Sequence, residues 1–395
     1  MVTFDDEQNR AIGNLRTYYD QWVSAARDVD GAYKGSMRWK TIGGHQYLYH
    51  RITNTPLVEP SLGRRSPATE QRMIAFQRGK ADAIARHNRA LAETTRFAKV
   101  ARALGLGLTP SQAARLLRHF DRKSMLGNLL LVVGTIAMSA YEVEAGMRIF
   151  DGFDATQDFD LTWRGIDALQ IQSTRPISLL GALREVDPLY TKNTERSFQA
   201  VSGKYEVEIL AAPSTLASFP KNDLVPIAGM VEQEWLLLGR PVRHVISATD
   251  GTPAPIVAPD PRWMALHKLW LSQKPRRQSA KRPKDQAQGL LLLRAVLEAM
   301  PNYPIDDEFV AETPPELKGF LRMGVEWAHE HPSMRQVAGS GDEFTRSGKP
   351  NLQAAVLRKI KRTAAAAPAF PADYEFNVQK APARPRAGQA YAPHK

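Results

Sequence analysis

The chain has 395 residues, of which 43% are hydrophobic and 24% are charged, and its formal net charge is +12. A chain of this length exceeds the usual size of one compact unit, so roughly two or three structural units are expected. The sequence contains no cysteine, which excludes disulfide bonds and cysteine-ligated metal sites. The positive charge favours polyanionic partners such as nucleic acids or nucleotide phosphates, although a soluble basic protein would carry it equally well.

The sequence has no segment typical of secretion or membrane insertion. Its first residues, MVTFDDEQNR, are acidic, and no apolar stretch of a signal peptide follows them. The most apolar stretch, Leu126–Tyr141, is short for a membrane span and contains Asn128 and Gly134. A buried strand, a turn and a helix explain this stretch better. We therefore expect a soluble cytoplasmic protein with no membrane partner.

Residues 1–125 are predicted to form a mostly helical region with a short hairpin. Apolar residues recur at helical spacing over residues 5–27, and Ser66-Pro67 opens an Ala- and Arg-rich helix to about residue 103. Between these helices, the segment KTIGGHQYLYHRIT has a Gly43-Gly44 turn between β-prone runs. Its alternating tyrosines are typical of packing in a hairpin, or of a surface that stacks on nucleic-acid bases.

Residues 126–260 are predicted to hold a mixed sheet. Leu129–Val133 has the composition of a buried strand, followed by a turn at Gly134-Thr135 and a helix to Ala145. Asp158–Trp163 and Tyr205–Leu210 alternate polar and apolar residues, as strands with one exposed face do. Further short strands are expected to extend this sheet at Trp235–Leu238, Val242–Ser247 and Pro255–Val257.

Residues 261–363 are predicted to be helical, and residues 364–395 to form a disordered basic tail. A helix over Arg262–Gln273 is followed by a linker, residues 274–284, with six basic residues and no acid. The linker would bind a nucleic-acid backbone, or it is simply a solvated loop. The next helix is expected over Asp285–Met300, with Asp285 as its N-cap.

The acidic residues of the predicted sheet suggest a metal site. Asp158 and Asp160 are two positions apart on one strand, so both carboxylates lie on the same face. Such a pair is most often a solvated strand face, but a divalent cation between the two acids would relieve their repulsion. Glu208, with Glu206 as its competitor, would add a third acid from another strand. Gly134-Thr135 would let phosphate approach the helix that follows, as phosphoryl transfer requires.

Three segments in this order, VVGT, TQDFDL and YEVEIL, resemble a known signature, hG[GS]…[DE]h[DE]h…h[DE]h. It belongs to the DNA polymerase β-type nucleotidyltransferase superfamily. Over roughly residues 5–300 the chain also resembles a poorly characterised bacterial branch of that superfamily. The shared segments are YLY at Tyr47–Tyr49, SLG at Ser61–Gly63, PDP at Pro259–Pro261, LHKL at Leu266–Leu269 and KRPKD at Lys281–Asp285.

The resemblance implies an α/β (α+β) fold, with a polymerase β-type core flanked by N-terminal and C-terminal helical regions. It implies transfer of a nucleoside monophosphate from an NTP to a hydroxyl of RNA, protein or a small molecule, with Mg²⁺ or Mn²⁺ as cofactor. The expected site residues are the catalytic and metal-binding Asp158, Asp160 and Glu208, and the nucleotide-binding Gly134, Thr135, Lys268 and Lys284.

The chain departs from the signature in three places. Thr135 stands where Ser or Gly is usual, Glu208 stands where Asp is common, and the spacing from Gly134 to Asp158 is long. A loop that includes Asp151–Asp154 is expected to fill this spacing. The departures leave open a catalytically weak nucleotide-binding regulatory protein. A second alternative, a toxin or phage-defence component of the same fold, follows from analogy with related nucleotidyltransferase families.

Overall fold

The computed structural model describes residues 1–54, 57–150, 158–165, 178–203, 205–220, 223–226, 230–275 and 277–332. The expected loop at Asp151–Asp154 and the expected basic tail, residues 364–395, lie outside the described residues. None of the described stretches includes a helix that is long and apolar enough to cross a membrane.

A five-stranded mixed sheet lies in the body of the molecule, in the order β11-β12-β13-β10-β8. Strand β10 runs parallel to β13 and antiparallel to β8. Together with the helices around it, this mixed sheet confirms the predicted α/β class. The strands are β8 (Leu130–Val132), β10 (Asp158–Trp163), β11 (Thr191–Lys192), β12 (Gln199–Ser202) and β13 (Tyr205–Ala211).

The predicted extension of this sheet is wrong. Strands β14 (Val242–Ala248) and β15 (Pro253–Ala258) pair with each other, and β14 also pairs with β7 (Leu108–Thr109), so they form a separate three-stranded sheet. The segment expected as a strand at Trp235–Leu238 belongs to a 3-10 helix, η2 (Val231–Leu237). The Trp235 ring packs edge-on against that of Trp270, 5.2 Å away between centroids. A short apolar run alone does not distinguish a strand from a buried helical turn.

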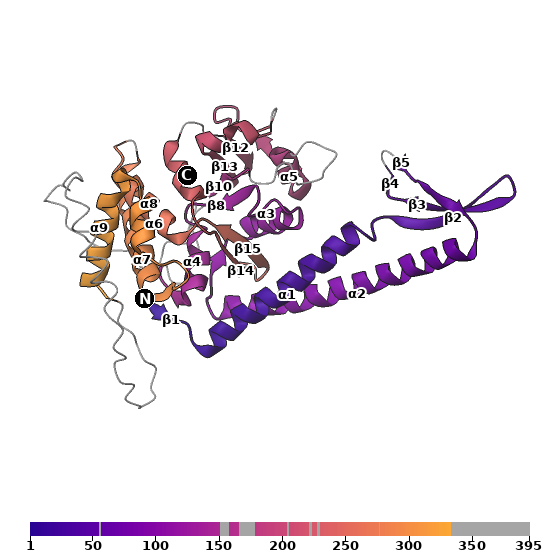
Figure 1. Cartoon of the computed structure of the whole chain (residues 1–395), viewed down its shortest axis with the longest axis horizontal. Coiled ribbons are helices and arrows are strands. Elements are labelled where there is room, and N and C mark those ends of the chain that lie inside the picture. The colour runs from indigo at the N-terminus through magenta and orange to yellow at the C-terminus, as the bar shows by residue number, and fades with distance from the viewer. Residues whose placement is uncertain are drawn as a thin grey trace, which may run out of the picture.

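Helices pack around the two sheets and share one large hydrophobic core with them. Its largest buried side chains include Trp163 of β10 and Trp263 of α6. Figure 1 shows α6, α7 and α9 together on one side of the body. The helices of the body are α3 (Ser111–Arg122), α4 (Met138–Ala145), α5 (Leu179–Val186), α6 (Pro261–Ser272), α7 (Arg282–Ala299), α8 (Asp307–Glu312) and α9 (Pro315–Glu330), with 3-10 turns η1 (Pro213–Ser218) and η3 (Ser279–Lys281).

Two long antiparallel helices, α1 (Asp6–Asp30) and α2 (Pro67–Ala103), project from the body as an arm (Figure 1). Ser66 caps α2 with its side chain. A small sheet lies at the far end of the arm, where β2 and β3 are joined by the Gly43-Gly44 turn. The arm and the N-terminus carry the strands β1 (Val2–Thr3, paired with β9, Met147–Arg148), β2 (Ser36–Ile42), β3 (His45–Arg51), β4 (Thr53–Asn54), β5 (Leu57–Val58) and β6 (Ser61–Arg64).

The base of the arm is anchored in the body by a second hydrophobic cluster. Leu15 and Trp22 of α1 are buried there, together with Val245 of β14. The Tyr19 hydroxyl donates a hydrogen bond to the buried carboxylate of Asp121, 3.0 Å away. These contacts fix the direction in which the arm leaves the body.

Candidate active site

Strands β10 and β13 bring the predicted acidic residues into one cavity. In their parallel register Asp160 lies beside Glu208, and Asp158 lies beside Glu206. Asp158, Asp160 and Glu208 line a cavity of about 410 Å³, a volume typical of small-molecule sites. Glu206 is not among its lining residues. The structure therefore favours Glu208 over Glu206 as the third acid of this cavity.

The turn after β8 shapes the floor of the cavity around Asp160. Gly134 has a φ of 71°, and a Cβ atom at this position would overlap the Asp160 carboxylate. The Val133 N–H donates to the Asp160 carbonyl at 3.0 Å, which holds the turn beside β10. A residue other than glycine would therefore displace the carboxylate or strain the turn.

The acidic residues are close enough to affect one another. Burial and the nearby carboxylate of Glu208 raise the pKa of Asp160 from 3.8 to about 7. The buried side chain of Gln199, on β12, donates from Nε2 to both Glu206, at 3.2 Å, and Glu208. Gln199 thus orients Glu208, a role that no motif in the sequence indicated.

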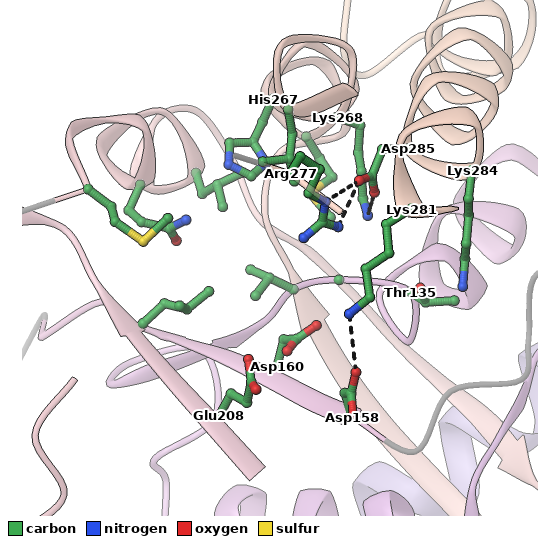
Figure 2. Close-up of a pocket in the computed structure, with 18 residues that line it drawn as sticks. Thr135, Asp158, Asp160, Glu208, His267, Lys268, Arg277, Lys281, Lys284 and Asp285 are labelled. Carbon is green, nitrogen blue, oxygen red and sulfur yellow. Dashed lines mark hydrogen bonds and ion pairs between the residues drawn. The ribbon is translucent and has the colours of Figure 1, made fainter. Parts of the chain in front are cut away.

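Basic residues from α6, from the segment between α6 and η3, from η3 and from the start of α7 line the opposite wall of the cavity. The Lys281 ammonium lies 3.6 Å from the Asp158 carboxylate. Figure 2 shows Lys281 reaching from this wall towards the acidic floor. The basic side chains that line the cavity are Lys268, Arg277, Lys281 and Lys284. The structure therefore brings both lysines predicted from the sequence to the cavity.

Asp285 binds two of these cations and is not an N-cap, contrary to the prediction. Helix α7 begins at Arg282, before the predicted start, with Pro283 in its first turn. The Asp285 carboxylate instead contacts Lys268 Nζ at 2.9 Å and a guanidinium nitrogen of Arg277 at 2.7 Å. Both side chains of the Lys268–Asp285 pair are almost fully buried.

The remaining predicted nucleotide-binding residue, Thr135, also lines the cavity. Helix α4, however, begins at Met138, so residues 134–137 form a turn before it. The predicted turn at Gly134-Thr135 is therefore confirmed, but it extends to residue 137, so the helix starts three residues after Thr135. Burial and the nearby ammonium of Lys268 lower the pKa of Lys284, which also lines the cavity.

One part of the cavity wall is apolar and holds polar atoms without partners. Gln233 Oε1 and both ring nitrogens of His267 are buried, and they have no hydrogen-bond partner among the residues that the structure describes. Burial and the adjacent Lys268 lower the pKa of His267 from 6.5 to about 3, so its imidazole is neutral at pH 7. The apolar residues of the cavity lining are Val133, Leu210, Met230, Leu236, Met264 and Leu271.

The acidic residues do not form a closed cage for a metal ion. Within the described residues, no group of three or more acidic or histidine side chains is close enough together to hold one. Asp158 and Asp160 nevertheless present carboxylates on the same strand face, at the edge of a cavity. Mg²⁺ commonly binds through one or two carboxylates and completes its octahedron with water and substrate phosphates. The donor set fits that mode of binding.

The sequence profile of a nucleotidyltransferase family matches residues 111–311, just over half of the chain. The chain belongs to this nucleotidyltransferase family. The match begins after the arm and includes every residue that lines the cavity. It is shorter than the resemblance over residues 5–300 that the sequence suggested. No curated protein and no solved structure shows significant similarity to this nucleotidyltransferase.

Proposed function

We propose that this nucleotidyltransferase transfers a nucleoside monophosphate from an NTP to an acceptor hydroxyl, in a polymerase β-type, metal-dependent reaction at the cavity. The observation that carries the proposal is the charge of the cavity. Of the described residues that line it, four are acidic and four are basic, so their formal charges cancel. A triphosphate adds several negative charges, and the cavity has no surplus positive charge to balance them.

A divalent cation supplies the missing charge, because when bound it neutralises the phosphate oxygens and polarises the reacting centre. Asp158 and Asp160 would hold Mg²⁺ or Mn²⁺ through carboxylate oxygens. The raised pKa of Asp160, which arises first from burial and then from the Glu208 carboxylate, supports this role, since a bound cation would stabilise the ionised carboxylate. Glu208 adjoins this pair and would contact the cation directly or through water.

The side chains of the cavity also suggest how the bonds change. The acceptor oxygen attacks the α-phosphorus, a new phosphorus–oxygen bond forms, and the bond between the α-phosphorus and its bridging oxygen to the β-phosphate breaks. Pyrophosphate carries away the electron pair of that bond, stabilised by Lys281 and Lys284. The acceptor hydroxyl loses its proton to the carboxylate of Glu208, which Gln199 orients.

The apolar part of the cavity would hold the base of the NTP. Met264 and Leu271 offer a surface for the ring faces, and Gln233 Oε1 and the neutral His267 offer unused hydrogen-bonding atoms for its edge. A bound base would satisfy these buried polar atoms, which otherwise destabilise the fold.

The basic linker, residues 274–284, faces the cavity in its described part. Arg277 and Lys281 line the cavity, and Lys274 lies over the Trp270 ring at 3.5 Å. This arrangement supports binding of the triphosphate by the linker more than docking of a nucleic-acid backbone.

The direct test is transfer of label from each α-labelled NTP into the components of a cell extract, with Mg²⁺ or Mn²⁺ present. We expect one class of extract component to be labelled by wild type and by the control variant Asp187→Asn, whose carboxylate lies outside the cavity. The double variant Asp158→Asn/Asp160→Asn is expected to give no label. Equal labelling by the double variant and wild type would contradict the proposal.

A further inference from the structure

The small sheet at the tip of the arm, formed by β2, β3 and β6, has two chemically different faces. One face packs against α2: Leu48 is fully buried, and the His50 ring lies 5.2 Å from that of Phe76 between centroids. The register places Lys40, Tyr47 and Arg64 side by side across the three strands on the other face. Cations and tyrosines therefore alternate on the face that is turned away from the arm.

The charge of the tip is strongly positive. Between Gly31 and Ser66 the sequence has six Lys or Arg residues and a single acid, Glu59. The Glu59 side chain is only 3% exposed, and it contacts Arg38 at 2.6 Å, Lys40, and Arg51 at 3.6 Å. The three cations remain 33–42% exposed. Glu59 thus holds the three cations in place and offsets only one of their three positive charges.

Two tyrosines lie among these cations. Tyr47 and Tyr49 are two positions apart on β3, so their rings share the outer face of the sheet. The Lys40 ammonium lies 4.5 Å from the centre of the Tyr49 ring. Both tyrosines are partly exposed. Aromatic rings on a sheet, flanked by cations, can stack on unpaired bases while the cations contact the backbone phosphates.

We propose that the outer face of the β2-β3-β6 sheet binds single-stranded nucleic acid. The cations would contact phosphates, and Tyr47 and Tyr49 would stack on bases. The arm is held to the body by the Tyr19–Asp121 hydrogen bond and the buried cluster around Leu15, so it would present the bound strand at a fixed position. Helix α2 alone spans roughly 55 Å at 1.5 Å per residue, so this surface is separate from the catalytic cavity.

The test is fluorescence anisotropy of the full-length chain with a labelled single-stranded RNA of about 20 nucleotides. No nucleotide or divalent metal is added, so failure of this experiment is distinct from failure of the catalytic proposal. The same strand as DNA and the RNA duplex are measured in parallel. We expect at least one single strand to bind, with higher affinity than the duplex and with an affinity that falls as salt rises.

Two matched double variants distinguish the contribution of the tip to binding from that of the overall positive charge of the chain. Lys40→Gln/Arg64→Gln removes two cations from the tip and leaves Arg38 and Arg51 with Glu59. Arg10→Gln/Arg16→Gln removes two exposed cations from α1. The tip variant is expected to reduce the slope of log affinity against log salt by about 0.7 for each lost phosphate contact. The α1 variant is expected to keep the wild-type slope.

Stacking is tested by two variants of Tyr47. Tyr47→Leu is expected to weaken binding at least about fivefold, whereas Tyr47→Phe, which keeps an aromatic ring, is expected to bind like wild type. Circular dichroism establishes that each variant is folded. Three results would each overturn the inference: no binding of either single strand by wild type, equal salt slopes for the two double variants, or tighter binding of the duplex than of the single strands.

Discussion

The carboxylate of Asp160 occupies the space that a side chain at position 134 would fill. Gly134 has a left-handed φ of 71°, and a Cβ atom there would overlap the Asp160 carboxylate. The glycine and the acid, 26 positions apart in the sequence, therefore form one structural unit. The Asp160 carboxylate therefore requires a glycine at position 134, whether or not this turn also binds phosphate.

Replacing Gly134 with Ala is expected to lower transfer activity on the order of a hundredfold, because the Asp160 carboxylate must move by a sizeable fraction of an ångström. The matched control is Gly146→Ala. Gly146 has a similar φ of 61°, but no heavy atom of another described residue lies within 4 Å of its added Cβ. Both variants should lose about 1–2 kcal/mol of stability from the left-handed backbone. Urea unfolding measures the stability of the two variants, and activity assays measure their transfer rates. Equal activity losses in the two variants would show that displacement of Asp160 is not the cause of the loss.

Glu208→Gln and Glu206→Gln distinguish the two glutamates of β13. Both accept from Gln199, but Glu208 alone of the two lines the cavity. We expect Glu208→Gln to lower kcat roughly a hundredfold or more, because a group that accepts a proton is lost. Glu206→Gln should retain wild-type activity, and EDTA should abolish the activity of both. A larger loss in Glu206→Gln than in Glu208→Gln would reverse the assignment.

His267 predicts a pH dependence of stability. Its pKa falls from 6.5 to about 3 on folding, so the unfolded chain binds more protons between these values. The free energy of unfolding should therefore decrease as the pH falls from 6.5 towards 3, by on the order of 2 kcal/mol at pH 5. His267→Phe should remove this contribution, whereas His329→Gln, at an exposed site, should leave it unchanged. Denaturant unfolding at pH 7 and pH 5 measures the difference.

Gln233→Leu removes the unpartnered acceptor from the apolar part of the cavity. We expect kcat/KM for the preferred NTP to fall about tenfold relative to the kcat/KM values for the other three NTPs, because one hydrogen bond to the preferred base is lost. Gln288→Leu is the control: Gln288 is fully buried, its amide has no hydrogen-bond partner within the described part of the chain, and it lies outside the cavity lining. Steady-state kinetics with ATP, CTP, GTP and UTP provide the comparison. An unchanged ranking and ratio of the four values in Gln233→Leu would place the base elsewhere.

The sequence predicted best where a pattern had a direct physical cause. Polar and apolar residues alternate in DFDLTW and YEVEIL, and this alternation identified β10 and β13. A strand with one polar face is the common explanation of such a pattern. The alternation also placed Asp158 and Asp160 on one strand face, and Glu208 was expected to add a third acid from another strand. The pairing of β10 with β13 could not be deduced, since it depends on backbone contacts between distant segments.

Other features depended on tertiary packing and escaped prediction. Asp285 had the position of a helix cap, but its carboxylate pairs with the buried Lys268 and the partly exposed Arg277. The segment around Trp235 had the composition of a strand, but it forms a 3-10 helix in which Trp235 packs against Trp270. Gln199 and Gln233 belong to no motif, and their positions in the site became evident only from the folded chain.

The ion pairs of Asp285 have a consequence for turnover. Lys268 and Arg277 already have a buried carboxylate partner, so any phosphate group that approaches them competes with a group that cannot diffuse away. Pyrophosphate left in the cavity after transfer would meet the same competition, and its residence time would be shorter than on two free cations. In the transfer reaction proposed above, an internal counter-ion of this kind would limit product inhibition, because Asp285 competes with pyrophosphate for Lys268 and Arg277.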